Sequence, residues 1–161
     1  MVIVASISRL KIPANLLLRH DPMEIRLIET SVMDLQYSPS TEGGEEDVRC
    51  RPVYREDQPS RFAVIYEVTA AFRRGGWLKL KYFAVFETSE AIGDEFRKSH
   101  FPRVNAPAVA YPYVRAFIAQ FSSLVGAETY TLPVRNFVKT PPPALSVPEP
   151  ALPETASPSG G

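Results

Sequence analysis

The side chains that could act as nucleophiles, general bases or soft metal ligands are few in this 161-residue chain: one cysteine and two histidines. His20 and His100 lie far apart, and neither has Cys, Asp or Glu at the spacing that zinc sites use. Cys50 lies between Arg49 and Arg51, whose positive charge could lower the pKa of the thiol and favour a reactive thiolate. Because no histidine lies near Cys50 in the sequence, we interpret the thiol as inert and both histidines as surface or structural residues.

An acidic run is the other candidate for chemistry. It surrounds a glycine pair, Gly43-Gly44, and a second pair, Gly75-Gly76, follows later. Carboxylates in a glycine-rich loop are more often a solvated face than a calcium or general-acid site, and neither pair has the spacing of a phosphate-binding loop. We therefore expect no enzymatic activity, no metal and no cofactor. The carboxylates of the run are Glu42, Glu45, Glu46 and Asp47.

Composition limits the partners and the compartment. Apolar residues make up 45% of the chain, which is enough for a core, and 18 basic residues balance 18 acidic ones. A neutral chain is not expected to bind nucleic acid as its main partner. The single cysteine excludes an intramolecular disulfide, and the segment 1–7 lacks the charged region of a signal peptide. We therefore expect a soluble, cytoplasmic protein without membrane insertion.

Alternating apolar and polar residues predict the first strand, over Met23–Tyr37. The segment 38–47 follows as a polar loop. A shorter strand is predicted over Val48–Tyr54, where Pro52 lacks an N–H donor and indicates a sheet edge or a bend. In the first strand, the side chains predicted to point inward are Ile25, Leu27, Met33, Leu35 and Tyr37, and those predicted to point outward are Arg26, Thr30, Asp34 and Gln36.

Two runs rich in aromatic and β-branched residues, Phe62–Phe72 and Trp77–Phe86, predict a hairpin. The turn Arg73-Arg-Gly-Gly76 between them contains two glycines that can adopt positive φ. Three or four strands followed by a helix define the α+β class, with an antiparallel sheet covered on one face.

A helix is predicted from Asn105 to Gly126. Asn105 is a candidate N-cap, Pro107 fits the first turn, and Gly126 fits the left-handed position after the helix. Pro112 indicates either that the regular helix starts nearer Tyr111 or that its first turn is bent. Apolar residues at three- and four-residue spacing predict one face that packs on a partner surface. That face consists of Ala110, Val114, Phe117, Ile118, Phe121, Leu124 and Val125.

The chain after Lys139 has seven prolines in 22 residues. This composition disfavours a helix or a central strand and predicts an extended or disordered tail, either inert and solubilising or able to dock in an aromatic groove. The expected division is an N-terminal segment over residues 1–22, for which no structure is predicted, a folded domain over 23–138 and a proline-rich tail over 139–161.

The helix and the segment after it resemble the SecB family of export chaperones. The helix of that family begins with a Pro-Tyr-x-Arg step, ends at a glycine and is followed by Pro-x-Asn-Phe. These features occur here as Tyr111-Pro-Tyr-Val-Arg115, Gly126 and Pro133-Val-Arg-Asn-Phe137. Upstream, Tyr66-Glu-Val-Thr-Ala70 and the strand to Phe86 look like the third and fourth strands of the family. The resemblance covers residues 62–137 and, more loosely, the first strand.

The resemblance implies a SecB-like four-stranded antiparallel sheet with one main helix on one face, assembled as a homotetramer that is a dimer of dimers. It implies a molecular chaperone of the holdase type, which binds unfolded or preprotein chains in apolar grooves without ATP, in protein export and translocation. Seventeen aromatic residues exceed what a one-helix core needs, which fits an apolar binding surface. From their position beside the matched motifs, the groove candidates are Tyr54, Tyr111, Phe117, Phe121, Tyr130 and Phe137.

Two departures narrow what the resemblance implies. The family continues past Asn-Phe into a second helix, which Val138-Lys-Thr-Pro-Pro-Pro143 prevents here. The translocase motor docks on acidic residues of the family's sheet, whereas Lys79 and Lys81 give the matching strand the opposite charge, so docking of that motor does not follow. Two alternatives stay open: a SecB-fold interaction module whose helix face serves only self-assembly, and a chaperone for a dedicated non-export client such as an antitoxin.

Overall fold

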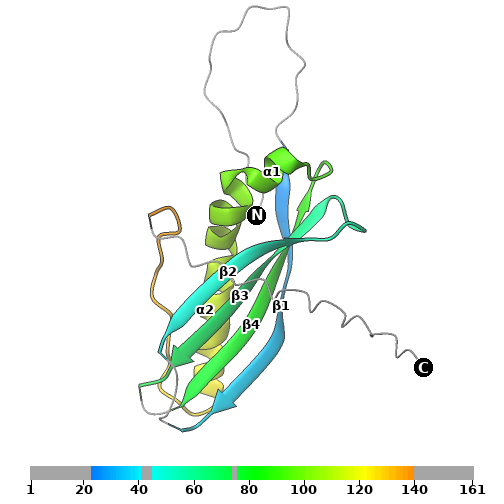
Figure 1. Cartoon of the computed structure of the whole chain (residues 1–161). Coiled ribbons are helices and arrows are strands. Elements are labelled where there is room, and N and C mark those ends of the chain that lie inside the picture. Colours follow the sequence, from blue (N-terminus) through cyan, green and yellow to red (C-terminus); the bar gives the residue numbers. More distant parts are fainter. Residues whose placement is uncertain (1–22, 41–44, 74–75, 140–161) are drawn as a thin grey trace, which may run out of the picture.

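The computed structural model describes residues 23–40, 45–73 and 76–139. Four strands form one antiparallel sheet in the order β1-β4-β3-β2, and one long helix, α2, packs on one face of it (Figure 1). The predicted α+β class, with a four-stranded sheet and one main helix, is confirmed. The strands are β1 Ile25–Ser38, β2 Asp47–Tyr54, β3 Arg61–Ala71 and β4 Trp77–Thr88. The helical segments are α1 Asp94–Lys98, the π-helical turn η1 Phe101–Asn105 and α2 Ala106–Leu124.

The core lies between α2 and the side of the sheet that faces it. Side chains of β3 and β4 alternate between buried and partly exposed, so that Val64, Leu80 and Phe86 point into the core. Tyr66 is also fully buried, and its hydroxyl donates a hydrogen bond of 2.6 Å to the carbonyl of Pro107. This bond joins the first turn of α2 to the middle of the sheet.

The hairpin between β3 and β4 is confirmed, and its two strands pair in continuous register. Gly76 in its turn has a φ of 103°. A Cβ atom at Gly76 would lie 3.1 Å from the carbonyl oxygen of Ser38, so both the backbone and the space require glycine here. The neighbouring Gly75 lies outside the described residues. The placement of Pro52 in an edge strand, β2, is also confirmed.

β1 departs from the predicted alternation because it contains two bulges, at Ile28 and at Met33. Each bulge inserts one residue and moves the following side chains to the other side of the strand. The prediction is therefore wrong for Thr30, which pairs with buried Ala84 and shares its side of the sheet, and for Met33, which lies on the opposite face. The other residues predicted to point inward do pack against the core: Ile25, Leu27, Leu35 and Tyr37.

α2 begins before Tyr111 and continues through Pro112, so the alternative in which the helix starts near Tyr111 is wrong. Pro112 lacks the N–H that would bond to the carbonyl of Ala108. Because Ala108 is exposed, water can donate a hydrogen bond to that carbonyl. Asn105 is the N-cap, as predicted, but its side chain makes no capping hydrogen bond. The π-helical turn η1 leads directly into α2, so a helical turn precedes α2 where a capping side chain was expected.

The end of α2 is the glycine-terminated motif that the sequence predicts. Gly126 has a φ of 76°. Its N–H bonds to the carbonyl of Ser123 at 3.2 Å, and the N–H of Ala127 bonds to the carbonyl of Ser122 at 3.0 Å. This pair of hydrogen bonds defines a Schellman motif, which satisfies carbonyls that the last helical turn leaves free. Up to Lys139, the described chain contains no second long helix.

The predicted helix face is correct except at its end. Leu124 is 84% exposed, because it lies outside the face of α2 that meets the sheet. Of the other six residues, Ala110, Val114 and Ile118 are fully buried and Phe117, Phe121 and Val125 are partly buried against the core.

Among the described residues, no helix has the length and apolar character needed to cross a bilayer. The predicted segment 1–22 and residues 140–161 of the predicted tail lie outside the described part of the chain. The division into residues 1–22, 23–138 and 139–161 therefore stays a prediction.

Candidate functional site

The segment after α2 is held against the helix by the residues of the Pro-Tyr-x-Arg and Asn-Phe motifs. The Tyr111 hydroxyl donates a hydrogen bond of 2.9 Å to the carbonyl of Pro133, and Arg115 Nε donates one of 2.8 Å to the carbonyl of Leu132. Phe137 packs edge-on against the Tyr111 ring, with 5.2 Å between centroids. The two motifs therefore contact each other within one chain, and Tyr111 and Phe137 are both buried.

A row of aromatic rings crosses from α2 to the sheet. Phe117 and Phe121 extend from the helix, and both are half-buried. Each contacts an aromatic residue of a strand, so the row spans both layers of the molecule. In the order of contact the row consists of Tyr82, Phe117, Phe121, Tyr37, Phe72 and Tyr130, with 5.6–6.2 Å between neighbouring ring centroids.

Large apolar residues recur at helical spacing along one edge of the packed face of α2, and we call them the α2 stripe: Tyr113, Phe117, Phe121 and Leu124. Tyr113 is 46% exposed and Leu124 is 84% exposed. The stripe lies beside β1, because the Phe121 ring contacts Tyr37 of that strand. In the described sheet β1 is an edge strand, so one side of its backbone has no strand partner.

The six predicted groove residues do not form one surface. Tyr111 and Phe137 are buried, whereas Phe117, Phe121 and Tyr130 belong to the aromatic row. The sixth residue, Tyr54, is separate from both groups and lies beside α1. Four of the six are therefore only half-buried and could touch another molecule, and the assignment of all six to a groove stays a prediction.

Tyr54, the separate residue, stacks on Phe62 with 6.0 Å between ring centroids, and the guanidinium of Arg97 lies 4.9 Å from the centre of the Tyr54 ring. Its hydroxyl is buried without a hydrogen-bond partner in the described chain. Burial raises the pKa of Tyr54, and the positive charges of Arg97 and Arg103 only partly oppose this.

Cys50 is buried, and burial raises the pKa of its thiol to about 12. The charge that opposes this rise in the pKa is that of Arg135, not that of the neighbours in sequence. Arg49 and Arg51 point to the other face of the sheet because successive side chains of a strand alternate. The interpretation of Cys50 as an inert thiol is the one that this geometry favours.

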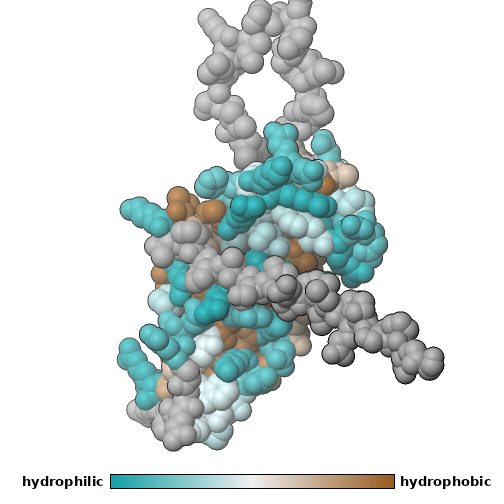
Figure 2. Space-filling model, in the orientation of Figure 1, coloured by the Kyte–Doolittle hydropathy of each residue, from teal (hydrophilic) through white to brown (hydrophobic). Residues whose placement is uncertain are grey.

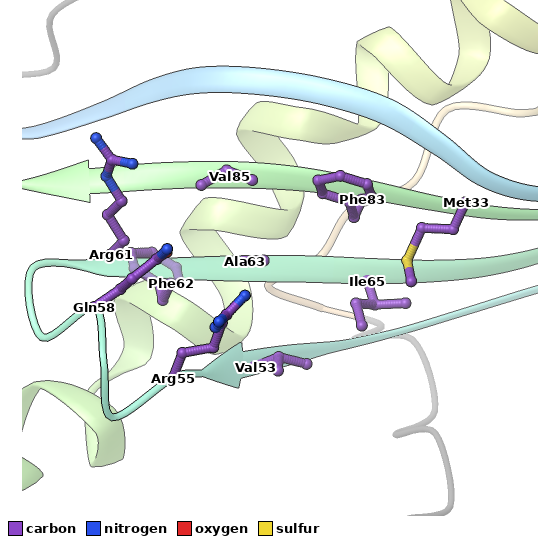
Figure 3. Close-up of a pocket in the computed structure, with 10 residues that line it drawn as sticks. All are labelled: Met33, Val53, Arg55, Gln58, Arg61, Phe62, Ala63, Ile65, Phe83 and Val85. Atoms are coloured by element: carbon purple, nitrogen blue, oxygen red, sulfur yellow. The ribbon is translucent and has the colours of Figure 1, made fainter.

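In the described part of the chain, no helix covers the other face of the sheet, which we call the open face (Figure 1). Figure 2 shows hydrophobic surface exposed between hydrophilic residues over this face. Toward the loop between β2 and β3, this face holds a half-enclosed hollow of about 270 Å³. Seven apolar residues from all four strands line it: Met33, Val53, Phe62, Ala63, Ile65, Phe83 and Val85 (Figure 3).

Lys79 and Lys81 lie on the open face, where the sequence places them, but they do not make it basic. Lys81 pairs with Glu67 at 3.1 Å, and Lys79 lies 5.3 Å from the centre of the Trp77 ring. Asp34 and Asp47 line the same shallow depression as the two lysines. This end of the open face therefore has mixed charge.

The hollow on the open face is a candidate site that sequence reasoning missed. The signal was available in β3 and β4, where the residues between the core positions are also apolar: Ala63, Ile65, Phe83 and Val85. Strands that are apolar on both sides are typical of a sheet whose two faces are both covered.

Comparison with solved structures assigns the class of fold as SecB-like. The SecB-like chaperone of Mycobacterium tuberculosis, solved in complex with a ChAD peptide from the HigA1 antitoxin, aligns with a TM-score of 0.56. The alignment covers 69% of this chain and 89% of that chain at 11% sequence identity. A protein of unknown function from Streptococcus agalactiae aligns over 70% of this chain and 98% of its own, with a TM-score of 0.49 and 12% identity. At 11% identity the likeness to the SecB-like chaperone concerns the fold alone.

An uncharacterized protein of Methanocaldococcus jannaschii is similar in sequence, with 27% identity over 88 residues. The match covers 52% of this chain and 56% of that protein, so the chain spans little more than half the length of this relative. No family model matches the sequence. The SecB-like fold is established by structure, whereas membership of the SecB family stays a prediction.

Proposed function

We propose that this protein is a cytoplasmic SecB-like chaperone that holds unfolded polypeptide chains on exposed apolar surface, without nucleotide and without catalysis. The observation that carries the proposal is the α2 stripe, where Tyr113 and Leu124 are 46% and 84% exposed beside the half-buried rings of Phe117 and Phe121. A contiguous exposed apolar surface on a folded protein marks a binding site. The SecB-like chaperone with the similar fold was solved with a peptide, which supports a polypeptide as the ligand.

The proposed clients are unfolded or extended chains, in export or in another pathway. Because the peptide in the similar structure comes from an antitoxin, a dedicated non-export client is a credible alternative to preproteins. We further propose that docking to the translocase motor is not part of this function. At their end of the open face, the lysines of β4 and Arg49 balance three carboxylates, those of Asp34, Asp47 and Glu67. This end is therefore not strongly acidic.

The test is suppression of aggregation. A chemically unfolded client is diluted into buffer with excess purified protein and without ATP, and light scattering is recorded. We expect the protein to reduce the scattering, and Leu124→Asp to weaken this effect by placing a charge in the stripe. Val134→Asp is the matched control, because Val134 is 81% exposed and lies outside the stripe. Undiminished scattering at stoichiometric excess of the protein would contradict the proposal.

A second candidate function is favoured by one observation, the position of the α2 stripe beside the free edge of β1. A free strand edge next to apolar surface can join two copies of a chain. The protein would then be an interaction module, and a dimer of dimers would use the stripe for assembly. A tetramer that takes up no hydrophobic dye and suppresses no aggregation would favour this function over the first.

A further inference from the structure

The hollow on the open face is formed by a small residue among larger ones. Ala63 of β3 pairs with Val53 of β2 on one side and with Val85 of β4 on the other. In the next row along the sheet, Ile65 pairs with Phe83. Because the side chain of Ala63 is a single methyl group, it forms the floor, and the longer side chains around it form the walls (Figure 3).

Met33 closes the hollow on the side of β1. It lies at the second bulge of the strand, its side chain is on the open face because of the first bulge, and its thioether points toward Ile65 (Figure 3). Met33 is 54% exposed. An unbranched thioether adapts to different apolar shapes, which suits a wall that must accept varied side chains.

One end of the hollow is cationic. Arg55, Gln58 and Arg61 line it there, and no carboxylate lines it (Figure 3). Arg51 pairs with Ile65 in the row beyond Ala63, and its Nε is buried without a hydrogen-bond partner in the described chain.

The carboxylates near this end only partly balance its charge. Asp57 pairs with Arg55 at 2.7 Å. Glu87 is shared, because it pairs with Arg61 at 2.8 Å and with Arg26 at 3.2 Å. Glu29 of β1 pairs with Val85 and lies on the same face. With Arg51 included, four guanidinium groups therefore meet three carboxylates, and one positive charge is left over.

The opposite end of the open face has no such excess. Lys81 pairs with Glu67 at 3.1 Å and Arg49 with Asp47 at 2.7 Å. A ligand that combines apolar groups with one anionic group is therefore expected to bind in one direction, with its anion at Arg55 and Arg61.

We propose that the hollow binds an extended polypeptide segment in which apolar side chains at alternate positions are followed by an acidic side chain. An extended chain presents every second side chain to one side, at a repeat of about 6.6–6.8 Å that matches the rows of the sheet. Apolar side chains would fill the hollow above Ala63, and the carboxylate would lie at Arg55 and Arg61. The choice of a polypeptide as the ligand rests on the proposed function. The proposal adds a second binding surface, with a sequence preference of its own.

The size and shape of the hollow favour a polypeptide over a small molecule. Its volume of about 270 Å³ is below the roughly 300–1,000 Å³ of pockets that enclose a drug-sized ligand. It is also only half enclosed, so a few side chains of a longer chain can occupy it while the rest of that chain lies outside.

The probe is a fluorescently labelled peptide, Gly-Ser-Val-Thr-Leu-Thr-Val-Ser-Glu-Gly, whose binding to the full chain is measured by anisotropy. Its three apolar side chains and its glutamate lie on one side when it is extended. Replacing the glutamate with glutamine should weaken binding about 2- to 10-fold, the range for one or two exposed charge pairs. Replacing the three apolar residues with serine should abolish binding. Equal affinity for all three peptides would overturn the proposal.

Two protein variants test whether the peptide binds in the hollow. Ala63→Leu fills the floor and should weaken binding about 10-fold or more, because one apolar side chain of the peptide loses its site. Ala71→Leu is the matched control, since it makes the same change on the same strand and face at an exposed position outside the hollow. Circular dichroism checks that both variants fold. Unchanged binding by folded Ala63→Leu would overturn the proposal.

The cationic end is tested with Arg55→Gln, which should weaken binding of the glutamate peptide and leave binding of the glutamine peptide unchanged. Arg49→Gln is the control, because Arg49 has the same kind of local carboxylate partner at the other end of the open face. Arg55→Gln that weakens both peptides equally would overturn the charge preference. If Ala63→Leu changes the mass of the oligomer in solution, a second copy occupies the hollow and the proposal is wrong. The two proposals are tested separately. If Ala63→Leu still suppresses aggregation, the proposed function stands, even if the peptide experiments contradict binding in the hollow.

Discussion

At the scale of single residues, Tyr66 makes the contact that joins the two layers of the fold. Its ring is buried in the sheet, and its hydroxyl bonds to the carbonyl of Pro107 at 2.6 Å. Tyr66→Phe keeps the ring and removes the donor, so the hydrogen bond between the sheet and the first turn of α2 is lost. We expect the free energy of unfolding in urea to fall by about 0.5–1.5 kcal/mol. Tyr113→Phe is the control, because Tyr113 is exposed, and a loss of equal size there would contradict this role of Tyr66.

Buried tyrosines and the buried thiol make the free energy of unfolding depend on pH in the alkaline range. Burial raises the pKa of Cys50 from 9.0 to about 12, and it raises the pKa of Tyr66 and Tyr111 above 10.0. A raised pKa means that the folded state keeps its proton longer than the unfolded state does. The contribution of these groups to stability is therefore complete below their unfolded pKa values and is lost as the pH rises through the folded ones.

We therefore expect the free energy of unfolding to be constant at neutral pH and to decline from about pH 9 upward, measured by urea unfolding at a series of pH values. The decline should be smaller in Cys50→Ala, which removes one of the groups concerned. A free energy of unfolding that does not change across the alkaline range would show that these groups are not buried as described.

At the scale of secondary structure, the turns are the features most sensitive to substitution. Gly76→Ala would place a Cβ atom 3.1 Å from the Ser38 carbonyl oxygen on a backbone with positive φ. We expect a loss of about 1–2 kcal/mol in the free energy of unfolding from the backbone conformation alone. Gly93→Ala is the control, because nothing lies within 4 Å of a Cβ there. Equal losses in the two variants would contradict the requirement for glycine in the hairpin.

The strands, the hairpin and the main helix were predictable because each has a local signal. Gly126 ends α2 as its sequence position indicates, and the aromatic runs form β3 and β4. The two bulges of β1 were not predictable, since one inserted residue leaves no mark in composition, and the first of them decides that Met33 faces the open side. The short helix α1 was also missed, although acidic residues in its first turn and basic ones in its last are typical helix signals.

The candidate site could be predicted only in part for a similar reason. Residues near the family motifs were natural groove candidates, but Tyr111 and Phe137 hold the segment after α2 in place and are buried. The Asn of the Asn-Phe motif has a local role as well, because Asn136 Oδ1 accepts the N–H groups of Val138 and Lys139, each at 3.0 Å. Periodicity identifies a buried face but does not say which exposed residues of two neighbouring elements lie side by side.

At the scale of the whole molecule, the fold places apolar surface on two opposite sides. The α2 stripe lies on the helical side beside β1, and the hollow around Ala63 lies on the open face of the sheet. If copies of the chain assemble through the stripe, the hollow remains available to a client. If the stripe itself binds the client, the hollow offers a second contact to the same long chain, which would strengthen binding through two linked sites.

The measurement that tests the central claim most directly is the mass of the protein in solution with and without a chemically unfolded client, obtained by light scattering during size-exclusion chromatography in the absence of ATP. A polypeptide-binding chaperone should elute as a discrete oligomer whose mass increases by that of bound client, and the same client in its folded form should add nothing. An oligomer whose mass is unchanged by excess unfolded client would contradict the account.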